Sequence, residues 1–422
     1  RVNYAALIET QEWAILSFSP ELFFRKNGKD ILMRPMKGTA SRGRTLEEDV
    51  ENSFQLRNSE KEKSENLMIV DLLRNDLGKI CEAGTVQVPA SMDVEQYETL
   101  LQMTSTVSGT LNPNVKTSDV LRATFPSGSV TGAPKIRTMQ IIDELEKRGR
   151  GIYTGCIGWW SAEQSVFNVA IRTLFLDRIS GELEMGVGSG ILYEADIERE
   201  YRECELKAKF LTEAGSKFKL IETIRWEQPH GYEHLNLHFD RLQRSAQYFL
   251  FEFNRDEVEH NLRIEEQKMK FHNARVRLLL DESGRVEIEC REIETPQTPV
   301  RILISKTRTS SADRFLYHKT TNRTLYDEEL HAARIKGYFD VIFLNERDEI
   351  TEGAISNIFI EKDGKLYTPP LNCGLLPGTY RRYVLESAEW DAHEKVLSIE
   401  DLRNADRIFV TNAIQGMLEA FM

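Results

Sequence analysis

Apolar positions recur every three or four residues in several segments, a pattern that predicts amphipathic helices. The clearest segments are residues 58–77, about 196–213, and 238–251. A further helix is expected after the turn at residues 126–135. It places Ile136, Met139, Ile142 and Leu145 on one face, which we expect to point inward.

Alternating and β-branched stretches predict strands in the second half of the chain, beginning at 218–224 and continuing at 274–280 and 285–292. Asp281–Gly284 is expected to join two of them as a hairpin turn, and Asp363-Gly364 marks a second hairpin. The fold class is therefore mixed α and β (α+β). Neither half shows the regular strand–helix alternation of a doubly wound sheet.

A chain of 422 residues exceeds one ordinary hydrophobic core, so more than one domain is expected. Thr212–Ser216 combines helix-ending and linker residues. This places one domain at 1–213 and a second at 218–422. Since the chain starts on Arg1 within a strand-like pattern, we expect part of the first domain to be missing.

Composition narrows the class of protein. The net charge of -12 argues against binding nucleic acid, whose phosphates favour a basic surface. The five cysteines include no C-x-x-C pair, which fits a reducing cytoplasm. There is no signal peptide, and no apolar run approaches the roughly 20 residues of a membrane span. We expect a cytoplasmic protein with no membrane partner.

Two acidic pairs stand at helical spacing, Glu62/Glu65 and Glu200/Glu203. Each pair taken alone is more readily explained as a solvated helix face. Both pairs lie in line with apolar residues, however, where carboxylates are costly unless something compensates them. A shared oxygen-ligand site is therefore indicated, and Mg²⁺ is the natural ion for carboxylates.

Lys37 follows a strand-like run and precedes a Gly-Thr turn, which alone describes many surface lysines. In Pro126–Lys135, Thr131 is a candidate N-cap, and such a helix terminus offers free N–H groups to an anion. Gly186–Gly190 is glycine-rich, but no helix opens directly after it, so a dinucleotide-binding loop is a weak interpretation.

Four motifs together carry a family resemblance: Arg34–Thr39, Ser59–Gly78, Gly128–Lys135 and Glu200–Lys207. In this order they resemble the chorismate-utilising enzymes, which include anthranilate, aminodeoxychorismate, isochorismate and salicylate synthases. The resemblance implies a chorismate-binding α/β sandwich. It implies Glu65, Glu203 and Glu200 as Mg²⁺ ligands, Glu62 as a general acid/base, and Thr39, Thr131, Arg172, Gly188 and Lys207 as substrate-binding residues.

Lys37 distinguishes reactions within that family. Anthranilate synthases resemble this stretch but carry a small residue at this position, whereas the lysine resembles the aminodeoxychorismate branch. There, the resemblance implies that the amine attacks ring carbon C2 as the C4 hydroxyl leaves, and ammonia then enters at C4. Two residues depart from the pattern: Gln102 replaces a frequent histidine, and Trp159 a frequent tyrosine.

The second half carries four further motifs: Tyr317–Arg323, Ile350–Phe359, Leu375–Thr379 and Phe409–Ala413. Together they resemble the class IV, fold-type IV enzymes that use pyridoxal 5′-phosphate (PLP). The resemblance implies Lys319 as the lysine that binds the cofactor covalently and Glu352 as partner of its ring nitrogen. It implies Arg241, Gly378, Thr379, Asn412 and Ala413 as the phosphate cup. Thr223 is a weaker candidate proton donor, since a strand threonine is the simpler interpretation.

The two resemblances imply a bifunctional enzyme that converts chorismate and ammonia into 4-aminobenzoate and pyruvate. No segment resembles a glutamine amidotransferase, so a separate subunit is expected to supply ammonia, and class IV relatives suggest a homodimer. Two alternatives stay open. One is an anthranilate- or isochorismate-type synthase joined to an amino-acid aminotransferase. In the other, one half is a non-catalytic binding module.

Overall fold

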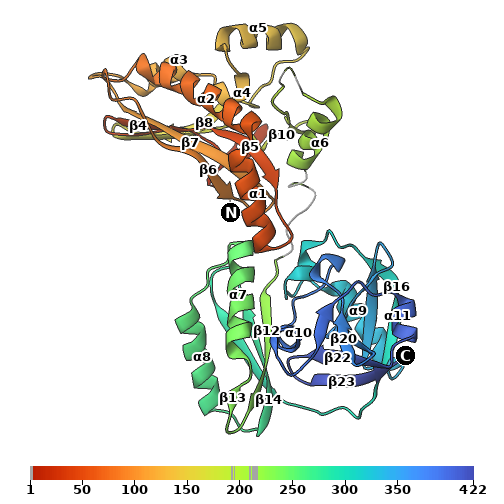
Figure 1. Cartoon of the computed structure of the whole chain (residues 1–422). Coiled ribbons are helices and arrows are strands. Elements are labelled where there is room, and N and C mark those ends of the chain that lie inside the picture. Colours follow the sequence, from red (N-terminus) through yellow and green to blue (C-terminus); the bar gives the residue numbers. More distant parts are fainter. Residues whose placement is uncertain (1–2, 192, 194, 209–210, 212–216) are drawn as a thin grey trace. The chain divides into compact units, whose positions relative to one another are not determined.

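The structure is a computed structural model that describes residues 3–191, 193, 195–208, 211 and 217–422. Within these residues the chain divides into two compact units. The first comprises Arg1–Arg42 and Val50–Gly215, and the second comprises Gly43–Asp49 and Ser216–Met422. Helices and strands occur in both units, so the predicted mixed α and β class is confirmed (Figure 1).

The first unit is built on two antiparallel sheets, because each of its strands pairs with neighbours that run the opposite way. The strand orders are β5-β7-β4-β3-β9-β8, with β6 paired along β7, and β1-β2-β10-β11. The strands are β1 (Tyr4–Glu9), β2 (Trp13–Ser19), β3 (Leu22–Asn27), β4 (Asp30–Arg34), β5 (Met36–Ser41), β6 (Gln87–Gln96), β7 (Leu100–Thr110), β8 (Cys156–Trp160), β9 (Gln164–Val169), β10 (Thr173–Asp177) and β11 (Leu183–Met185).

Helix α2 covers the larger sheet and confirms the helix expected at 58–77. The Ser59 side chain accepts a hydrogen bond from the backbone N–H of Glu62, which caps the helix start. Ile69 and Leu73 pack into the same core as Phe24 of β3. The helices of this part of the sequence are α1 (Leu46–Asn58), α2 (Glu60–Gly78), α3 (Thr117–Thr124), α4 (Gly128–Thr131), α5 (Lys135–Leu145) and α6 (Ile197–Ala208).

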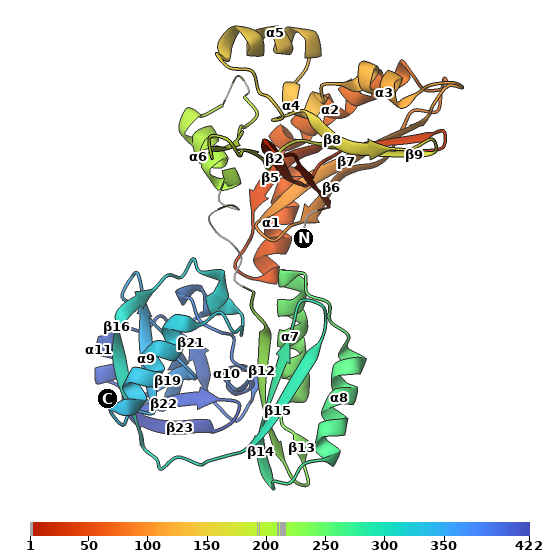
Figure 2. The ribbon, with the colours of Figure 1, turned by 180° about the vertical axis from the view of Figure 1, so that it is seen from behind.

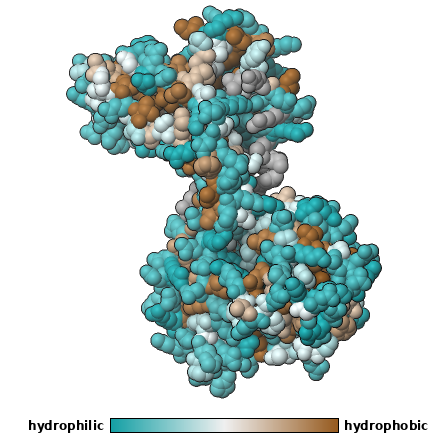
Figure 3. Space-filling model, in the orientation of Figure 1, coloured by the Kyte–Doolittle hydropathy of each residue, from teal (hydrophilic) through white to brown (hydrophobic). Residues whose placement is uncertain are grey.

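The apolar face of α5 corrects one prediction. Ile136 and Leu145 were expected to point inward, but they are 76% and 75% exposed, and α5 buries none of its residues. Figure 3 shows hydrophobic side chains on the surface of this region of the first unit. Helical periodicity identifies an apolar face correctly, but it does not show whether another part of the described chain packs against that face.

Helix α6 lies within the helix predicted at about 196–213. It runs over Ile197–Ala208, and residues 209, 210, 212 and 213 lie outside the described residues. In the part of the chain that the structure describes, no helix is both long and apolar enough to cross a bilayer.

The second unit contains two sheets with the strand orders β13-β12-β14-β15 and β18-β17-β16-β23-β22-β19-β20-β21. Helices α7 and α8 cover one face of the first sheet, whose opposite face is turned to the viewer in Figure 2. The strands are β12 (Leu220–Glu227), β13 (Gly231–Tyr232), β14 (Asn273–Leu280), β15 (Val286–Glu292), β16 (Val300–Thr309), β17 (Asp340–Asn345), β18 (Ile350–Gly353), β19 (Asn357–Lys362), β20 (Lys365–Thr368), β21 (Ala392–Glu394), β22 (Arg407–Asn412) and β23 (Gly416–Phe421).

Both predicted hairpins of this unit are confirmed, because β14 pairs with β15 and β19 pairs with β20 in antiparallel register. Helix α7 starts and ends a few residues before the predicted 238–251. The helices are α7 (Leu235–Phe249), α8 (Arg255–Gln267), α9 (Thr324–Ile335), α10 (Thr379–Glu386) and α11 (Ile399–Arg403), with short 3₁₀ turns at Arg314–Tyr317 and Leu371–Cys373.

Candidate active sites in the two units

Lys37 lies in an irregular part of β5. The register with β7 shifts between Met36 and Thr39, so Lys37 and Gly38 form a bulge. Gly38 has φ +87°, and a Cβ there would lie 3.1 Å from Glu62 Oε2. The glycine therefore allows the backbone of the bulge to approach the carboxylate of α2, which brings Glu62 beside the Lys37 segment.

Gln102 on β7 holds this bulge in place. Its Nε2 donates a hydrogen bond of 2.8 Å to the Gly38 carbonyl. The Thr39 hydroxyl donates to Gln102 Oε1 at 3.2 Å. Gln102 departs from the family pattern, yet it has a defined structural role here, because its hydrogen bonds fix the backbone next to Lys37. The predicted substrate residue Thr39 is part of the same contact.

The glycine-rich loop brings residues from β5, α2 and α6 together. A Cβ on Gly190 would lie 3.5 Å from Lys37 Nζ and 3.9 Å from Glu65 Oε2. At Gly188, the carbonyl accepts a hydrogen bond of 3.0 Å from Lys207 Nζ. The same amine pairs with Glu203 Oε1 at 2.6 Å. Side chains predicted from three separate motifs therefore meet at this loop.

Glu21 is a candidate that the sequence analysis missed. It lies between β2 and β3, is 3% exposed, and accepts a hydrogen bond of 2.5 Å from the Ser129 hydroxyl. Burial raises the pKa of this carboxyl to about 7, although Ser129 and the charges of Lys37 and Lys207 oppose the shift. The carboxyl is therefore about half protonated at neutral pH, and it lies in the electrostatic field of two predicted site lysines.

Two predicted substrate residues, Thr131 and Arg172, and the departing residue Trp159 belong to other segments of the first unit. Thr131 ends α4, and its hydroxyl donates to the Ser127 carbonyl at 2.9 Å, so the predicted N-cap role is wrong. Arg172 occupies a positive φ of 48° between β9 and β10, and burial lowers its pKa. Trp159 on β8 is largely exposed. Substrate contacts of Thr131 and Arg172 stay predictions.

The predicted Mg²⁺ ligands are of the right chemical kind, and their assignment stays a prediction. Carboxylate oxygens suit a hard divalent cation. Across the described ranges, however, no group of three or more His, Cys, Asp or Glu side chains is placed to hold a metal ion. Glu203 is paired with Lys207, and Glu65 lies 3.9 Å from Lys61. Glu200 is buried on α6.

The second unit contains a cavity of about 350 Å³. Its lining includes every residue predicted to hold the cofactor, namely Arg241, Lys319, Glu352, Gly378, Thr379, Asn412 and Ala413. Thr223 lies on β12 and is not among the described residues that line the cavity, so its role as a proton donor stays a prediction.

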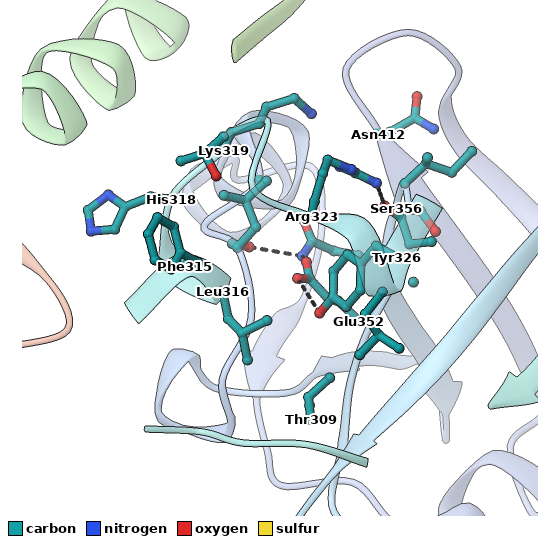
Figure 4. A pocket seen from close by; sticks show the side chains of 18 of the residues that line it. Thr309, Phe315, Leu316, His318, Lys319, Arg323, Tyr326, Glu352, Ser356 and Asn412 are labelled. Atoms are coloured by element: carbon teal, nitrogen blue, oxygen red, sulfur yellow. Dashed lines mark hydrogen bonds between the residues drawn. The ribbon is translucent and has the colours of Figure 1, made fainter. Parts of the chain in front are cut away.

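Glu352 is buried in this cavity, and Lys319 is half-buried in its lining (Figure 4). Burial, together with the charges of Arg241 and Arg323, lowers the pKa of Lys319 to about 7. Burial also raises the pKa of Glu352 to about 8. The hydroxyl of Tyr326 donates to Glu352 Oε1 at 3.2 Å. Near neutral pH the cavity therefore offers an amine that is about half in its neutral form and a carboxyl that is largely protonated.

Arg241 is held by two residues that the sequence analysis missed, Glu222 and His238. Its Nε and Nη2 donate to the two oxygens of Glu222 at 2.9 and 2.6 Å. His238 Nδ1 lies 2.6 Å from Glu222 Oε2. Burial alone would raise the pKa of Glu222, but Arg241 and His238 outweigh it and lower the pKa to about 2. The carboxylate therefore stays charged and fixes the guanidinium.

The Arg241 guanidinium also reaches the turn before α10. Its Nη1 donates to the Pro377 carbonyl at 3.2 Å, next to Gly378. Helix α10 begins at Thr379, so its first N–H groups are free to bind an anion beside a fixed cation. These residues fit the phosphate of PLP, and the Lys319–Glu352 pair fits the rest of that cofactor.

Replacing Gly378 with alanine is expected to damage this cup. The added Cβ would lie 1.9 Å from Oδ1 of the buried Asn357, so either the turn or the Asn357 side chain must move. We expect a loss of about 1–3 kcal/mol in unfolding free energy and weaker PLP binding, measured by thermal denaturation and cofactor titration. Gly149→Ala is the control, because nothing lies within 4 Å of its Cβ. Unchanged stability and cofactor affinity in Gly378→Ala would contradict the assignment.

Comparison with known proteins agrees with this geometry. The family model of chorismate binding enzymes matches residues 1–213, half of the chain. The chain belongs to the chorismate-binding enzymes. In this member of the family, residues 219–420 match a second family model, that of the class IV amino-transferases. The two family models match in the same order along the chain as the two resemblances.

Two curated relatives match the chorismate-binding half. Aminodeoxychorismate synthase component 1 of Bacillus subtilis is 42% identical over 49% of this chain and 43% of its own length. Anthranilate synthase component 1 of Saccharolobus solfataricus is 44% identical over 51% of each chain. The chain thus spans about half the length of these relatives. A solved branched-chain amino acid aminotransferase from Escherichia coli is 24% identical, with a TM-score of 0.44, over 49% of this chain and 77% of that one.

Proposed function

We propose that this chain makes 4-aminobenzoate from chorismate in two reactions. The first unit would exchange the C4 hydroxyl of chorismate for an amino group, consuming ammonia and releasing water. The second unit would remove pyruvate from the resulting 4-amino-4-deoxychorismate. The observation that carries the proposal is the position of Lys37, whose amine meets Glu65 at the glycine-rich loop of a chorismate-binding unit.

In the first reaction, Lys37 Nζ attacks ring carbon C2 as the C4 hydroxyl departs. The leaving hydroxyl needs a proton. Glu62, beside the Lys37 bulge, and protonated Glu21 are the carboxyls that we propose to handle it. Ammonia then attacks C4 and expels the lysine, which restores the amine. Mg²⁺ is the proposed cofactor of this unit, and the carboxylates of Glu65, Glu200 and Glu203 would be its ligands.

In the second reaction, PLP when bound supplies an electron sink for the charge left at the amine-bearing carbon. Lys319, whose pKa burial lowers to about 7, would accept the proton from that carbon in its neutral form. Glu352 would be the partner of the ring nitrogen of PLP, and Arg241 would hold its phosphate. Departure of the enol-pyruvyl group then leaves an aromatic ring, which makes the elimination favourable.

Several further assignments accompany this function. Ammonia would come from a glutamine amidotransferase subunit. The PLP-binding unit would form a homodimer, and the protein would work in the cytoplasm. These assignments rest on the family resemblance.

The deciding experiment identifies the product. Purified protein is incubated with chorismate, ammonium, Mg²⁺ and PLP, and the products are separated by liquid chromatography. We expect 4-aminobenzoate and pyruvate in equal amounts. Anthranilate, the product named by the 44% identical relative, would overturn the first reaction. Accumulation of aminodeoxychorismate without pyruvate would overturn the second and indicate a non-catalytic second unit.

A further inference from the structure

A fully buried carboxyl group, that of Asp340, lies behind the wall of the cavity and takes no part in the two proposed reactions. Asp340 is the first residue of β17, is 0% exposed, and is not among the described residues that line the cavity. Burial raises its pKa to about 6, against the opposing effect of its hydrogen bonds and of the charge of Arg323. The group is therefore largely ionised at neutral pH, and within the described residues it forms no ion pair.

Three donors bind the two oxygens of Asp340. The backbone N–H of Val341 donates to Oδ1 at 2.8 Å. Oδ2 accepts hydrogen bonds from the Ser356 hydroxyl at 2.5 Å and from the backbone N–H of Ile355 at 3.4 Å. Ser356 and Ile355 belong to the turn at residues 353–356, which we call the wall turn because all four of its residues line the cavity. The carboxylate therefore ties the wall turn to the start of β17.

The wall turn is closed and packs tightly against this carboxylate. The Gly353 N–H donates to the Ser356 carbonyl at 2.7 Å, and the Ala354 N–H donates to the Val341 carbonyl at 3.0 Å. A Cβ on Gly353 would lie 2.2 Å from Asp340 Oδ2, so a glycine is needed for the backbone to approach the carboxylate this closely. The wall turn is thus fixed to β17 along its whole length.

The wall turn joins two residues that reach separate ends of the cofactor site. Glu352 precedes the turn and is the proposed partner of the ring nitrogen (Figure 4). Asn357 follows the turn, and its Nδ2 donates to Glu352 Oε2 at 3.3 Å and to the Leu376 carbonyl at 3.0 Å. Leu376 stands two residues before Gly378 of the phosphate cup. A shift of the wall turn would therefore move Glu352 relative to that cup.

We propose that Asp340 is a positioning residue for the cofactor of the second unit. Its carboxylate holds the wall turn, and the turn sets the distance between Glu352 and the phosphate cup. Burying this charge costs stability, because the carboxylate loses its hydration. A carboxylate nevertheless suits the position, since both of its oxygens accept hydrogen bonds and neither donates. The proposal rests on the proposed function for the identity of the cofactor.

Asp340→Asn tests this role in the full chain. The amide keeps the size of the side chain but has a single acceptor oxygen, so the backbone N–H of either Val341 or Ile355 loses its acceptor. Without cofactor, we expect the amide hydrogens of the wall turn to exchange about 10- to 100-fold faster, as the loss of a hydrogen bond to a charged group implies. Hydrogen–deuterium exchange with mass spectrometry measures this change.

Cofactor binding and turnover provide the second readout. For Asp340→Asn, we expect the Kd of PLP to rise about tenfold and kcat of the second reaction to fall about 10- to 100-fold, because small displacements at reacting groups are costly. KM for aminodeoxychorismate should change less than about threefold, since Asp340 does not line the cavity. Ser356→Ala should give smaller losses of the same kind. Combined with Asp340→Asn it should add nothing, because Ser356 acts through Asp340.

Thr368→Val is the matched control. The buried Thr368 hydroxyl donates to the Ile358 carbonyl at 2.7 Å, and Thr368 is not among the described residues that line the cavity. This variant should lose thermal stability but keep the wild-type PLP affinity and kcat. Wild-type PLP affinity and kcat in Asp340→Asn, or additive losses in the double variant, overturn the proposal. If Asp340→Asn does not fold, unchanged PLP affinity in Ser356→Ala overturns it.

Failure of the proposed function gives a different pattern. If the wild-type protein binds PLP but releases no pyruvate from aminodeoxychorismate, the second reaction fails. The PLP affinities of the same variants then still decide the role of Asp340. If the wild-type protein produces 4-aminobenzoate and Asp340→Asn matches it in PLP affinity and kcat, only the positioning role fails. A wild-type protein that does not bind PLP overturns both.

Discussion

Lys319→Ala is expected to abolish formation of 4-aminobenzoate while the first unit continues to work. Removing a residue that acts directly in the chemistry costs on the order of 10³- to 10⁶-fold in kcat. Lys319 lines the cavity, and because its pKa is lowered to about 7, about half of its amine is neutral at pH 7. Among the described lining residues no second lysine occurs that could replace it. Chorismate and ammonium should therefore yield aminodeoxychorismate that accumulates without pyruvate.

Chromatography of the products and an assay for pyruvate measure this outcome. Lys336→Ala is the control, because Lys336 follows α9 outside the cavity lining and is exposed. Lys319→Arg tests size and charge, since it keeps a cation but cannot bind the cofactor covalently. Formation of 4-aminobenzoate by Lys319→Ala at more than about one hundredth of the wild-type rate would contradict the proposed role.

The pH dependence of cofactor loading follows from the same environment. Because the folded-state pKa of Lys319 is lowered to about 7, its amine is protonated below pH 7 and neutral above it. Only the neutral amine reacts with the aldehyde of PLP, so the rate of loading should rise as pH increases and reach half its maximum near pH 7. Stopped-flow absorbance records this rate. A midpoint near 10, typical of an exposed lysine, would show that burial does not control the reaction.

The sequence predicted those parts of the fold that depend on local pattern. The 58–77 helix has its cap at Ser59, and both hairpins have the expected turns. The cavity residues come from motifs far apart in the chain, and they line one cavity because the second unit folds them together. The resemblance supplied this grouping, since the spacing between Lys319 and Glu352 carries no such information.

Residues that act through tertiary contacts could not be predicted from pattern. Glu222 and Glu21 stand on or beside strands, where their burial depends on partners distant in sequence, Arg241 and Ser129. The prediction that the apolar face of α5 is buried was wrong for the converse reason. Periodicity identifies an apolar face, but it does not show whether another element packs against that face. Thr131 shows that a threonine near a helix end has more than one use, since its hydroxyl bonds to the Ser127 carbonyl four residues earlier.

Lys37→Ala is expected to lower kcat of the first reaction by at least about 10³-fold. No other described amine lies within 4 Å of the position that a Cβ on Gly190 would occupy, so none can replace Lys37 there. The second unit should convert supplied aminodeoxychorismate at the wild-type rate. Lys63→Ala is the matched control, since Lys63 pairs with Glu60 on the first turn of α2. Liquid chromatography of reactions started from chorismate, and separately from aminodeoxychorismate, measures both effects in one preparation.

The identity of any remaining product tests the mechanism more sharply than the rate. While Lys37 occupies C2, ammonia has C4 as its site of attack, so a covalent lysine directs amination to that carbon. Without the lysine, C2 is free, and residual amination should shift toward the anthranilate type of product. A variant that still aminates C4 at near the wild-type rate would show that Lys37 does not bond to the ring. Mass spectrometry of wild-type protein quenched with chorismate but without ammonia should then find no adduct on Lys37, whereas the proposed mechanism requires one.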